Sequence, residues 1–124
     1  MKRLTPEQII QLHEILIKHT GGSDGIRDRG LLESAVYAPF HSFDGIPIFP
    51  TIEKKAARLG FGLIKNHPFV DGNKRIGMLA MLSFLEINGI PLHCTDEELV
   101  KIGLGLAEGT VNENMLLQFI MEHN

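Results

Sequence analysis

A run of apolar side chains at residues 76–85 constrains the fold of this chain more than any other feature. It reads Ile-Gly-Met-Leu-Ala-Met-Leu-Ser-Phe-Leu, so a helix built from it is hydrophobic on nearly every side. Such a helix belongs at the centre of a domain, because every face of it must be covered by other elements. We expect it to run from residue 72 or 73 to Asn88 and to end at Gly89. A close helix crossing, or room for a ligand, would explain Gly77 inside it.

Helix-start patterns divide the rest of the chain into further helices. Thr5 and Thr95 each begin a capping box, and Thr51 is a suitable N-cap for another helix. The chain is therefore expected to be all-α: a compact helical bundle, a single domain over residues 1–124, with a short flap or loop insertion at residues 39–50. The other expected helices cover about residues 6–20, 30–38, 52–65, 96–107 and 112–123.

The first of these helices carries two histidines, His13 and His19. Both are interpreted as solvent-facing or hydrogen-bonded helix residues, and neither is given a functional role. The apolar stripe of this helix is expected to consist of Ile9, Ile10, Leu12, Ile15 and Leu16.

Composition argues against several classes of protein. The net charge is −3 and no Lys/Arg-rich run occurs, so no nucleic acid is expected as a direct partner. No uninterrupted apolar run reaches transmembrane length and the first residues do not form a signal peptide, so no membrane partner is expected. Cys94 is the single cysteine and cannot form an internal disulfide, which fits a reducing compartment. The expected location is the cytoplasm.

A polar stretch, residues 67–75, leads directly into the apolar helix and reads His-Pro-Phe-Val-Asp-Gly-Asn-Lys-Arg. The first N–H groups of a helix have no internal partner, and the helix dipole places partial positive charge there. Gly72 allows the loop to turn its amides toward a bound anion. Lys74 and Arg75 add full positive charges, and arginine can bind phosphate through two hydrogen bonds. These features predict an anion site.

The remaining polar residues of the stretch add a metal ligand and a base. Asp71 offers the oxygen ligand that Mg²⁺ prefers, often alongside substrate phosphates. His67 can act as a general base near neutral pH. A zinc site is disfavoured, because Pro68 and Gly72 interrupt helical ligand spacing and no further Cys or His lies nearby in the sequence. Dinucleotide-binding and P-loop patterns are absent. The stretch therefore predicts metal-assisted phosphate chemistry on a hydroxyl group.

The pattern H-P-F-x-D-G-N-K-R resembles the signature of the Fic/Doc superfamily, H-x-F-x-[D/E]-[G/A]-N-[G/K]-R-x-x-R. Lys74, where most Fic proteins have Gly, is similar to the death-on-curing (Doc) toxin branch. Met78, in place of the final Arg, is a second similarity to the Doc branch. Residues 25–35 and the overall length add to the resemblance, which spans most of the chain.

The resemblance implies an ATP- and Mg²⁺-dependent kinase that transfers the γ-phosphate to a Ser or Thr hydroxyl of a target protein. His67 would be the catalytic base and Asp71 the metal ligand. Gly72 is the Fic-like residue at a position where Doc has Ala, and it leaves AMP transfer possible as the alternative. A non-catalytic nucleotide- or partner-binding module is a further alternative. The residues implied to bind the nucleotide are Gly72, Asn73, Lys74 and Arg75.

The resemblance also implies partners. The target would be a translation factor, with elongation factor Tu as the first candidate, and its modification would inhibit translation. No Ser or Thr is followed four residues later by Glu, so the self-inhibitory Fic motif is absent. The toxin would then be inhibited by a small antitoxin with a disordered tail that folds on binding. Residues 39–50, rich in Pro and Phe, are either a loop whose aromatic rings fill the core or a flap that pairs with the target.

Overall fold

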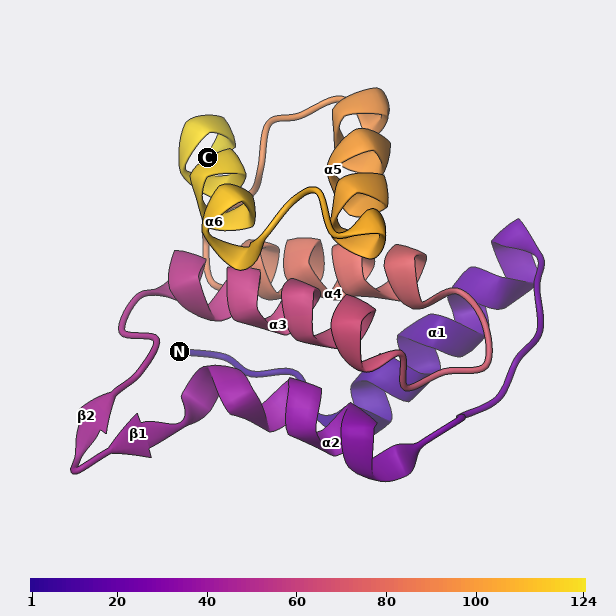
Figure 1. Cartoon of the computed structure of the whole chain (residues 1–124), viewed down its shortest axis with the longest axis horizontal. Coiled ribbons are helices and arrows are strands. Elements are labelled where there is room, and N and C mark those ends of the chain that lie inside the picture. The colour runs from indigo at the N-terminus through magenta and orange to yellow at the C-terminus, as the bar shows by residue number, and fades with distance from the viewer.

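The computed structural model describes the whole chain, residues 1–124, as a helical bundle with one small hairpin (Figure 1). The all-α prediction is confirmed, and the expected helix bounds hold to within a residue or two. None of the helices combines the length and apolarity that a bilayer crossing requires. The elements in order are α1 (Pro6–Thr20), α2 (Arg29–Tyr37), the 3₁₀ turn η1 (Ala38–Phe40), β1 (Ser42–Phe43), β2 (Ile46–Pro47), α3 (Ile52–Asn66), α4 (Asn73–Ile87), α5 (Asp96–Glu108) and α6 (Glu113–His123).

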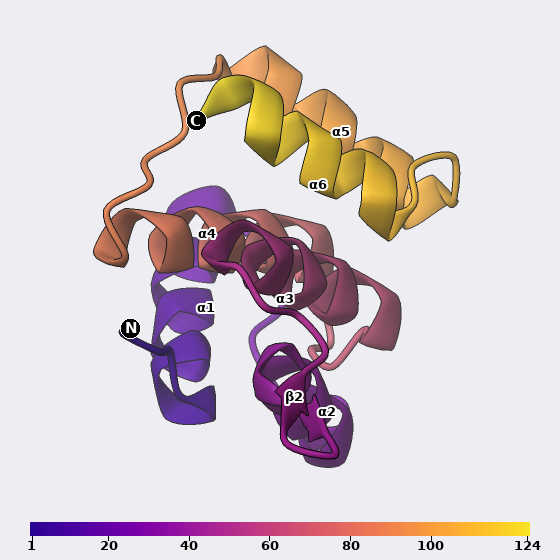
Figure 2. The ribbon, with the colours of Figure 1, turned by 90° about the vertical axis from the view of Figure 1, so that its left-hand side faces the viewer.

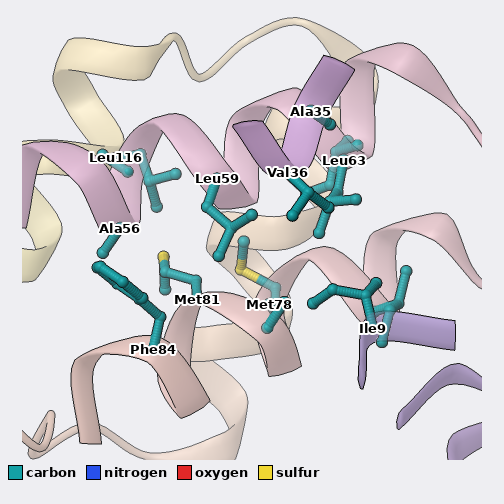
Figure 3. Packing of buried hydrophobic residues seen from close by; sticks show 14 of the residues in the cluster. Ile9, Ala35, Val36, Ala56, Leu59, Leu63, Met78, Met81, Phe84 and Leu116 are labelled. Carbon is teal, nitrogen blue, oxygen red and sulfur yellow. The ribbon is translucent and has the colours of Figure 1, made fainter. Parts of the chain in front are cut away.

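α4 is the central helix, as its sequence predicts. It packs along α3, and α1 and α5 also contact it (Figures 1 and 2). Figure 3 shows Met81 and Phe84 of α4 facing α3, where Ala56 and Leu59 lie, and Leu116 of α6 beside them. These residues belong to one cluster of 19 buried apolar residues. Covering α4 in this way removes its apolar surface from water, which is the main free-energy gain of the fold.

Gly77 permits a close crossing between α3 and α4. A Cβ atom added at Gly77 would lie 2.6 Å from Cγ1 of Ile64 and 3.1 Å from the carbonyl oxygen of Gly60. Any larger residue would therefore force the two helices apart. Of the two explanations for Gly77, the structure supports helix packing.

α1 buries the predicted apolar stripe except for Ile15, and it also buries two residues outside that stripe, His13 and Ile17. Ile15 is 56% exposed, whereas Ile9, His13 and Ile17 are buried at successive four-residue steps along the helix. The prediction that His13 faces solvent, or is an ordinary satisfied helix residue, is therefore incomplete. Its imidazole is only 1% exposed and lies in the interface that α1 forms with the rest of the bundle.

The segment between α2 and α3 contains both an aromatic ring that packs into the core and an exposed hairpin. Phe40 packs edge-on against Phe84, with ring centroids 5.9 Å apart. Phe43 and Ile46, paired across the antiparallel strands β1 and β2, are 77% and 69% exposed. The hairpin precedes α3, whereas residues 67–72 follow it, so the two lie at opposite ends of this helix (Figure 1). A helix of 15 residues is about 22 Å long, so the hairpin does not border the polar stretch.

Candidate active site

Residues 67–72 form the loop that joins α3 to α4, and we call it the motif loop. His67 ends α3 in the left-handed conformation, with φ 51° and ψ 54°. Pro68 explains this end, because the residue before a proline is pushed out of the helical conformation. The His67 side chain is exposed, and its ring nitrogens have no hydrogen-bond partner within the chain. An imidazole in this setting is free to accept a proton from a bound hydroxyl.

α4 is the one α-helix whose start has no side-chain cap. Thr5, Asp28, Thr51, Thr95 and Asn112 cap the other α-helices by accepting a hydrogen bond from a backbone N–H. α4 instead begins after Gly72, which has φ 78° and no side chain to offer. The first amides of α4 are therefore left to another acceptor, and an anion suits both these amides and the helix dipole.

Asn73 fixes the motif loop from inside the protein. Its side chain is 5% exposed, and its Oδ1 accepts a hydrogen bond from the Phe69 N–H at 2.9 Å. Its Nδ2 donates to the Phe69 carbonyl at 3.0 Å. Both polar atoms of the Asn73 side chain therefore bond to the backbone of the motif loop. The backbone N–H of Asn73, at the first turn of α4, is the group that remains for a phosphate oxygen.

Asp71 presents a carboxylate held by two backbone donors. Its Oδ2 accepts a hydrogen bond from the Ser23 N–H at 3.1 Å, and its Oδ1 accepts one from the Gly72 N–H at 2.8 Å. These two bonds lower the pKa of Asp71, and the charges of Arg75, 3.7 Å away, and His13 lower it further. The carboxylate is thus ionised at neutral pH, as a cation ligand must be.

The predicted site residues meet around one hollow of about 410 Å³. Ile64 of α3 and Ala107 of α5 complete its wall. The hollow thus joins the end of α3, the start of α4 and the C-terminal half of α5. The six predicted residues that line it are His67, Asp71, Gly72, Asn73, Lys74 and Arg75.

The two cationic side chains at the hollow, Lys74 and Arg75, differ in their contacts with the rest of the protein. Lys74 is exposed and forms no ion pair or hydrogen bond with its side chain. The Arg75 guanidinium donates to the Gly21 carbonyl at 2.9 Å and to the Thr20 hydroxyl, and it lies near Asp71. Arg75 therefore ties the end of α1 to the motif loop as well as lining the hollow, whereas Lys74 is free to meet an anion.

The donor set fits a magnesium ion that arrives with a nucleotide. Asp71 is the only carboxylate that lines the hollow, and no group of three His, Cys, Asp or Glu side chains is arranged to hold a metal. Zn²⁺ in proteins is usually held by three or four such ligands. Mg²⁺ usually keeps several waters and takes one or two carboxylates plus phosphate oxygens. The residues present suit this second kind of binding.

The segment from Gly22 to Asp28 covers the outer side of the motif loop. The N–H groups of Arg27 and Asp28 both donate to the Pro68 carbonyl, at 2.7 and 3.0 Å. The Arg27 guanidinium donates to the carbonyls of His67 at 2.7 Å and Asn66 at 3.0 Å. It thereby satisfies carbonyls at the end of α3 that have no partner within the helix.

Comparison with known proteins agrees with the motif. The chain matches the Fic/DOC family over residues 3–85. It is 30% identical over 112 residues to the protein kinase doc of Escherichia phage P1, a match that covers 90% of this chain and 87% of that protein. The chain belongs to the Fic/DOC family. It is also 44% identical over 72 residues to the toxin Doc of Mycolicibacterium smegmatis, covering 58% of this chain and 55% of that relative, so the matched part spans about half the relative's length.

Two residues at the Fic/DOC site were missed by the sequence reasoning. Arg27 was given no role, and nothing in its local sequence shows that it reaches the end of α3. His13 was given no role, although it lies four residues from Ile9 and four from Ile17. A histidine within such an apolar stripe is the signal that could have identified it as buried.

Proposed function

We propose that this protein is the toxin of a toxin–antitoxin pair and transfers the γ-phosphoryl group of ATP to a Ser or Thr hydroxyl of a target protein. One observation carries the proposal: a free imidazole, an ionised carboxylate, a free ammonium group and an uncapped helix start all line one hollow. Each is a group that phosphoryl transfer requires, and this reaction depends mainly on positioning and electrostatics.

The reaction follows from the placement of these groups. The His67 imidazole accepts the proton of the target hydroxyl as the hydroxyl oxygen forms its bond to the γ-phosphorus. The bond between the γ-phosphorus and the oxygen that bridges it to the β-phosphate breaks, and ADP leaves. The amides of Asn73 and Lys74 at the start of α4 bind phosphate oxygens. The Lys74 ammonium, with Arg75 beside it, offsets charge on the transferring group.

Asp71 is the residue that would hold Mg²⁺. Bound there together with the nucleotide, the ion would neutralise phosphate charge and orient the phosphate chain. Asp71 suits this task because two backbone N–H groups fix its carboxylate and keep it ionised.

Kinase activity, toxicity and an antitoxin partner are supported by the names of the two relatives, a protein kinase doc and a toxin Doc. The proposed partners are a cytoplasmic target, with elongation factor Tu as the first candidate, and a small antitoxin whose disordered tail folds onto the toxin. Growth arrest would then result from the inhibition of translation.

AMP transfer is the second candidate, and Gly72 is the residue that favours it. Gly72 has φ 78°, a conformation that other residues rarely adopt, and a Cβ atom there would lie 3.1 Å from Cδ1 of Ile17. An alanine, the residue of the Doc branch, would therefore be strained in this backbone. The loop is built around the Fic-like residue, and this is the observation that favours AMP transfer.

A label-transfer assay tests the proposal. The purified protein, with Mg²⁺ and bacterial lysate or purified elongation factor Tu, is incubated with ATP labelled at either the γ- or the α-phosphate. His67→Ala is the test variant. His19→Ala is its control, because His19 is exposed on α1 and does not line the hollow.

Three outcomes are distinguishable. Protein labelled from γ alone, lost in His67→Ala and kept in His19→Ala, supports the kinase. Label from α establishes AMP transfer in its place. Nucleotide binding without transfer of either label identifies a non-catalytic binding module.

A further inference from the structure

The site contains a second histidine whose surroundings are the opposite of those of His67. His13, on α1, is 1% exposed, whereas His67 is exposed and unpartnered. Burying an imidazole is unfavourable unless its nitrogens find partners. Nε2 of His13 finds its partner in the motif loop, 58 positions away in the sequence. Nδ1 lies 3.6 Å from the Asp24 carboxylate, in the 22–28 segment that covers this loop.

One ring nitrogen of His13 fixes the backbone at Asp71. Nε2 lies 2.7 Å from the Asp71 carbonyl oxygen. A carbonyl can only accept a hydrogen bond, so Nε2 carries the proton and donates it. The carboxylate of Asp71 is held from the outside by Ser23 and Gly72, and its backbone is held from the inside by His13.

The ring of His13 also supports the neighbouring parts of the loop. It stacks on Phe69, with ring centroids 3.8 Å apart and planes 9° apart. A Cβ atom at Gly72 would lie 3.5 Å from Nε2, so the imidazole lies directly beneath the start of α4. One side chain of α1 therefore contacts both Phe69 and Asp71 and borders the space beside Gly72.

We propose that His13 is a positioning residue of the active site. Its Nε2–H sets the location of the Asp71 carboxylate and of the first α4 amides relative to His67, through the Asp71 backbone. This role rests on the proposed function for its effect on catalysis. Displacement of a catalytic group by about 1 Å can reduce rates 100-fold, so a donor that fixes this backbone affects turnover more than target binding.

Two substitutions of His13 distinguish the effect of its hydrogen-bond donor from the effect of its stacked ring. His13→Gln keeps an amide N–H at similar reach and loses the stacked ring, whereas His13→Phe keeps a ring on Phe69 and loses the donor. His19→Gln and His19→Phe on the same helix are the controls, because the His19 imidazole contacts only the Ile15 carbonyl one turn earlier. All variants are assayed at a temperature where each remains folded by circular dichroism.

The expected result is that His13→Gln stays close to wild type, while His13→Phe lowers kcat roughly 10- to 100-fold with little change in KM for the target. Both His19 variants should match wild type. If His13→Phe is as active as His13→Gln, or more so, the imidazole serves only as packing and the proposal is overturned.

A second measurement does not depend on activity. The N–H groups of Phe69, Val70 and Gly72 are hydrogen-bonded within and around the motif loop. Their hydrogen exchange, followed by NMR, should be faster in His13→Phe than in wild type, and His13→Gln should restore protection. Unchanged exchange in His13→Phe overturns the positioning role even if the protein transfers phosphate. If exchange is faster in His13→Phe but the wild-type protein transfers no label, the positioning role of His13 is supported and the proposed function is rejected.

Discussion

The two irregular segments at the ends of α3 are held in contrasting ways. The motif loop is bonded to three separate parts of the chain: α1 through His13, the 22–28 segment through Ser23 and Arg27, and α4 through Asn73. The hairpin at residues 42–47 is held by its own short ladder, and its apolar side chains Phe43 and Ile46 face solvent.

The different numbers of bonds suit the two segments to different tasks. A loop with bonds to several elements keeps its groups in one arrangement, as transfer chemistry requires. An exposed hairpin with few contacts to the core adapts its shape to what it meets at little cost to the fold. Changes in the motif loop should therefore reduce stability and turnover together, and changes in the hairpin should affect neither. Substitutions in the two segments test this contrast, and their expected effects on stability range from several kcal/mol to almost none.

Asn73→Ala should have the largest effect on stability. It leaves the buried N–H and C=O of Phe69 without partners, and each such group costs about 1–3 kcal/mol. We expect the free energy of unfolding, measured in urea, to fall by about 2–4 kcal/mol. Asn114→Ala is the control, because Asn114 is exposed on α6 and should change stability by no more than about 0.5 kcal/mol. Equal losses in the two variants would contradict the contrast.

Arg27→Met should have the next largest effect. It removes the donor to the His67 and Asn66 carbonyls, so we expect a loss of about 1 kcal/mol in unfolding free energy. Because His67 is then less firmly held, kcat for transfer should fall while KM changes little. Arg29→Met is the control: Arg29 pairs with Glu7 and Glu33 and does not touch the motif loop. A kcat loss of the same size in Arg29→Met would show that Arg27 has no special connection to the site.

The lowered pKa of Asp71 predicts how acid affects the motif loop. A carboxyl whose pKa is lower in the folded than in the unfolded state stabilises the fold above the unfolded pKa, about 3.9, and this contribution is lost as pH falls through the folded pKa. Asp71→Asn should therefore be less stable than wild type at neutral pH, and the gap should narrow toward about pH 3. Thermal unfolding at both pH values measures it.

Asp44→Asn is the matched control in the hairpin turn, where Asp44 has φ 54°, a conformation that Asn also tolerates. Its stability relative to wild type should change little between the same two pH values. A gap that stays constant for Asp71→Asn would show that the bonds from Ser23 and Gly72 contribute nothing to stability.

The hairpin should show the smallest effect on stability. Phe43→Thr combined with Ile46→Thr keeps strand propensity and removes two exposed apolar side chains. We expect a change in unfolding free energy of no more than about 0.5 kcal/mol and an unchanged kcat. Titration of the target tests whether KM rises, which would place the hairpin on a docking surface remote from His67. A reduced kcat would instead show that the hairpin affects the chemical step, which would contradict the contrast between the hairpin and the motif loop.

Much of the fold follows from the sequence alone, because its signals are local. Thr5, Thr51 and Thr95 cap the helices that their patterns predict. The apolar run at 76–85 predicts the central helix, and Pro68 and Gly72 mark the motif loop between two helices. The motif itself predicts which six residues surround the hollow, since all lie within nine consecutive positions.

The tertiary structure decided which groups hold that motif in place and which remain free. His13 bonds to Asp71 across 58 positions and Arg27 to His67 across 40, and neither partner is visible in a local pattern. The position of the hairpin is likewise set by the fold, because α3 places it far from His67. The bonds of the Asn73 side chain to the Phe69 backbone, by contrast, span only four positions. Residue type and spacing determine the chemistry that a segment can perform. The choice of hydrogen-bond partners depends on how distant helices pack, because a donor binds the acceptor that the fold brings within reach.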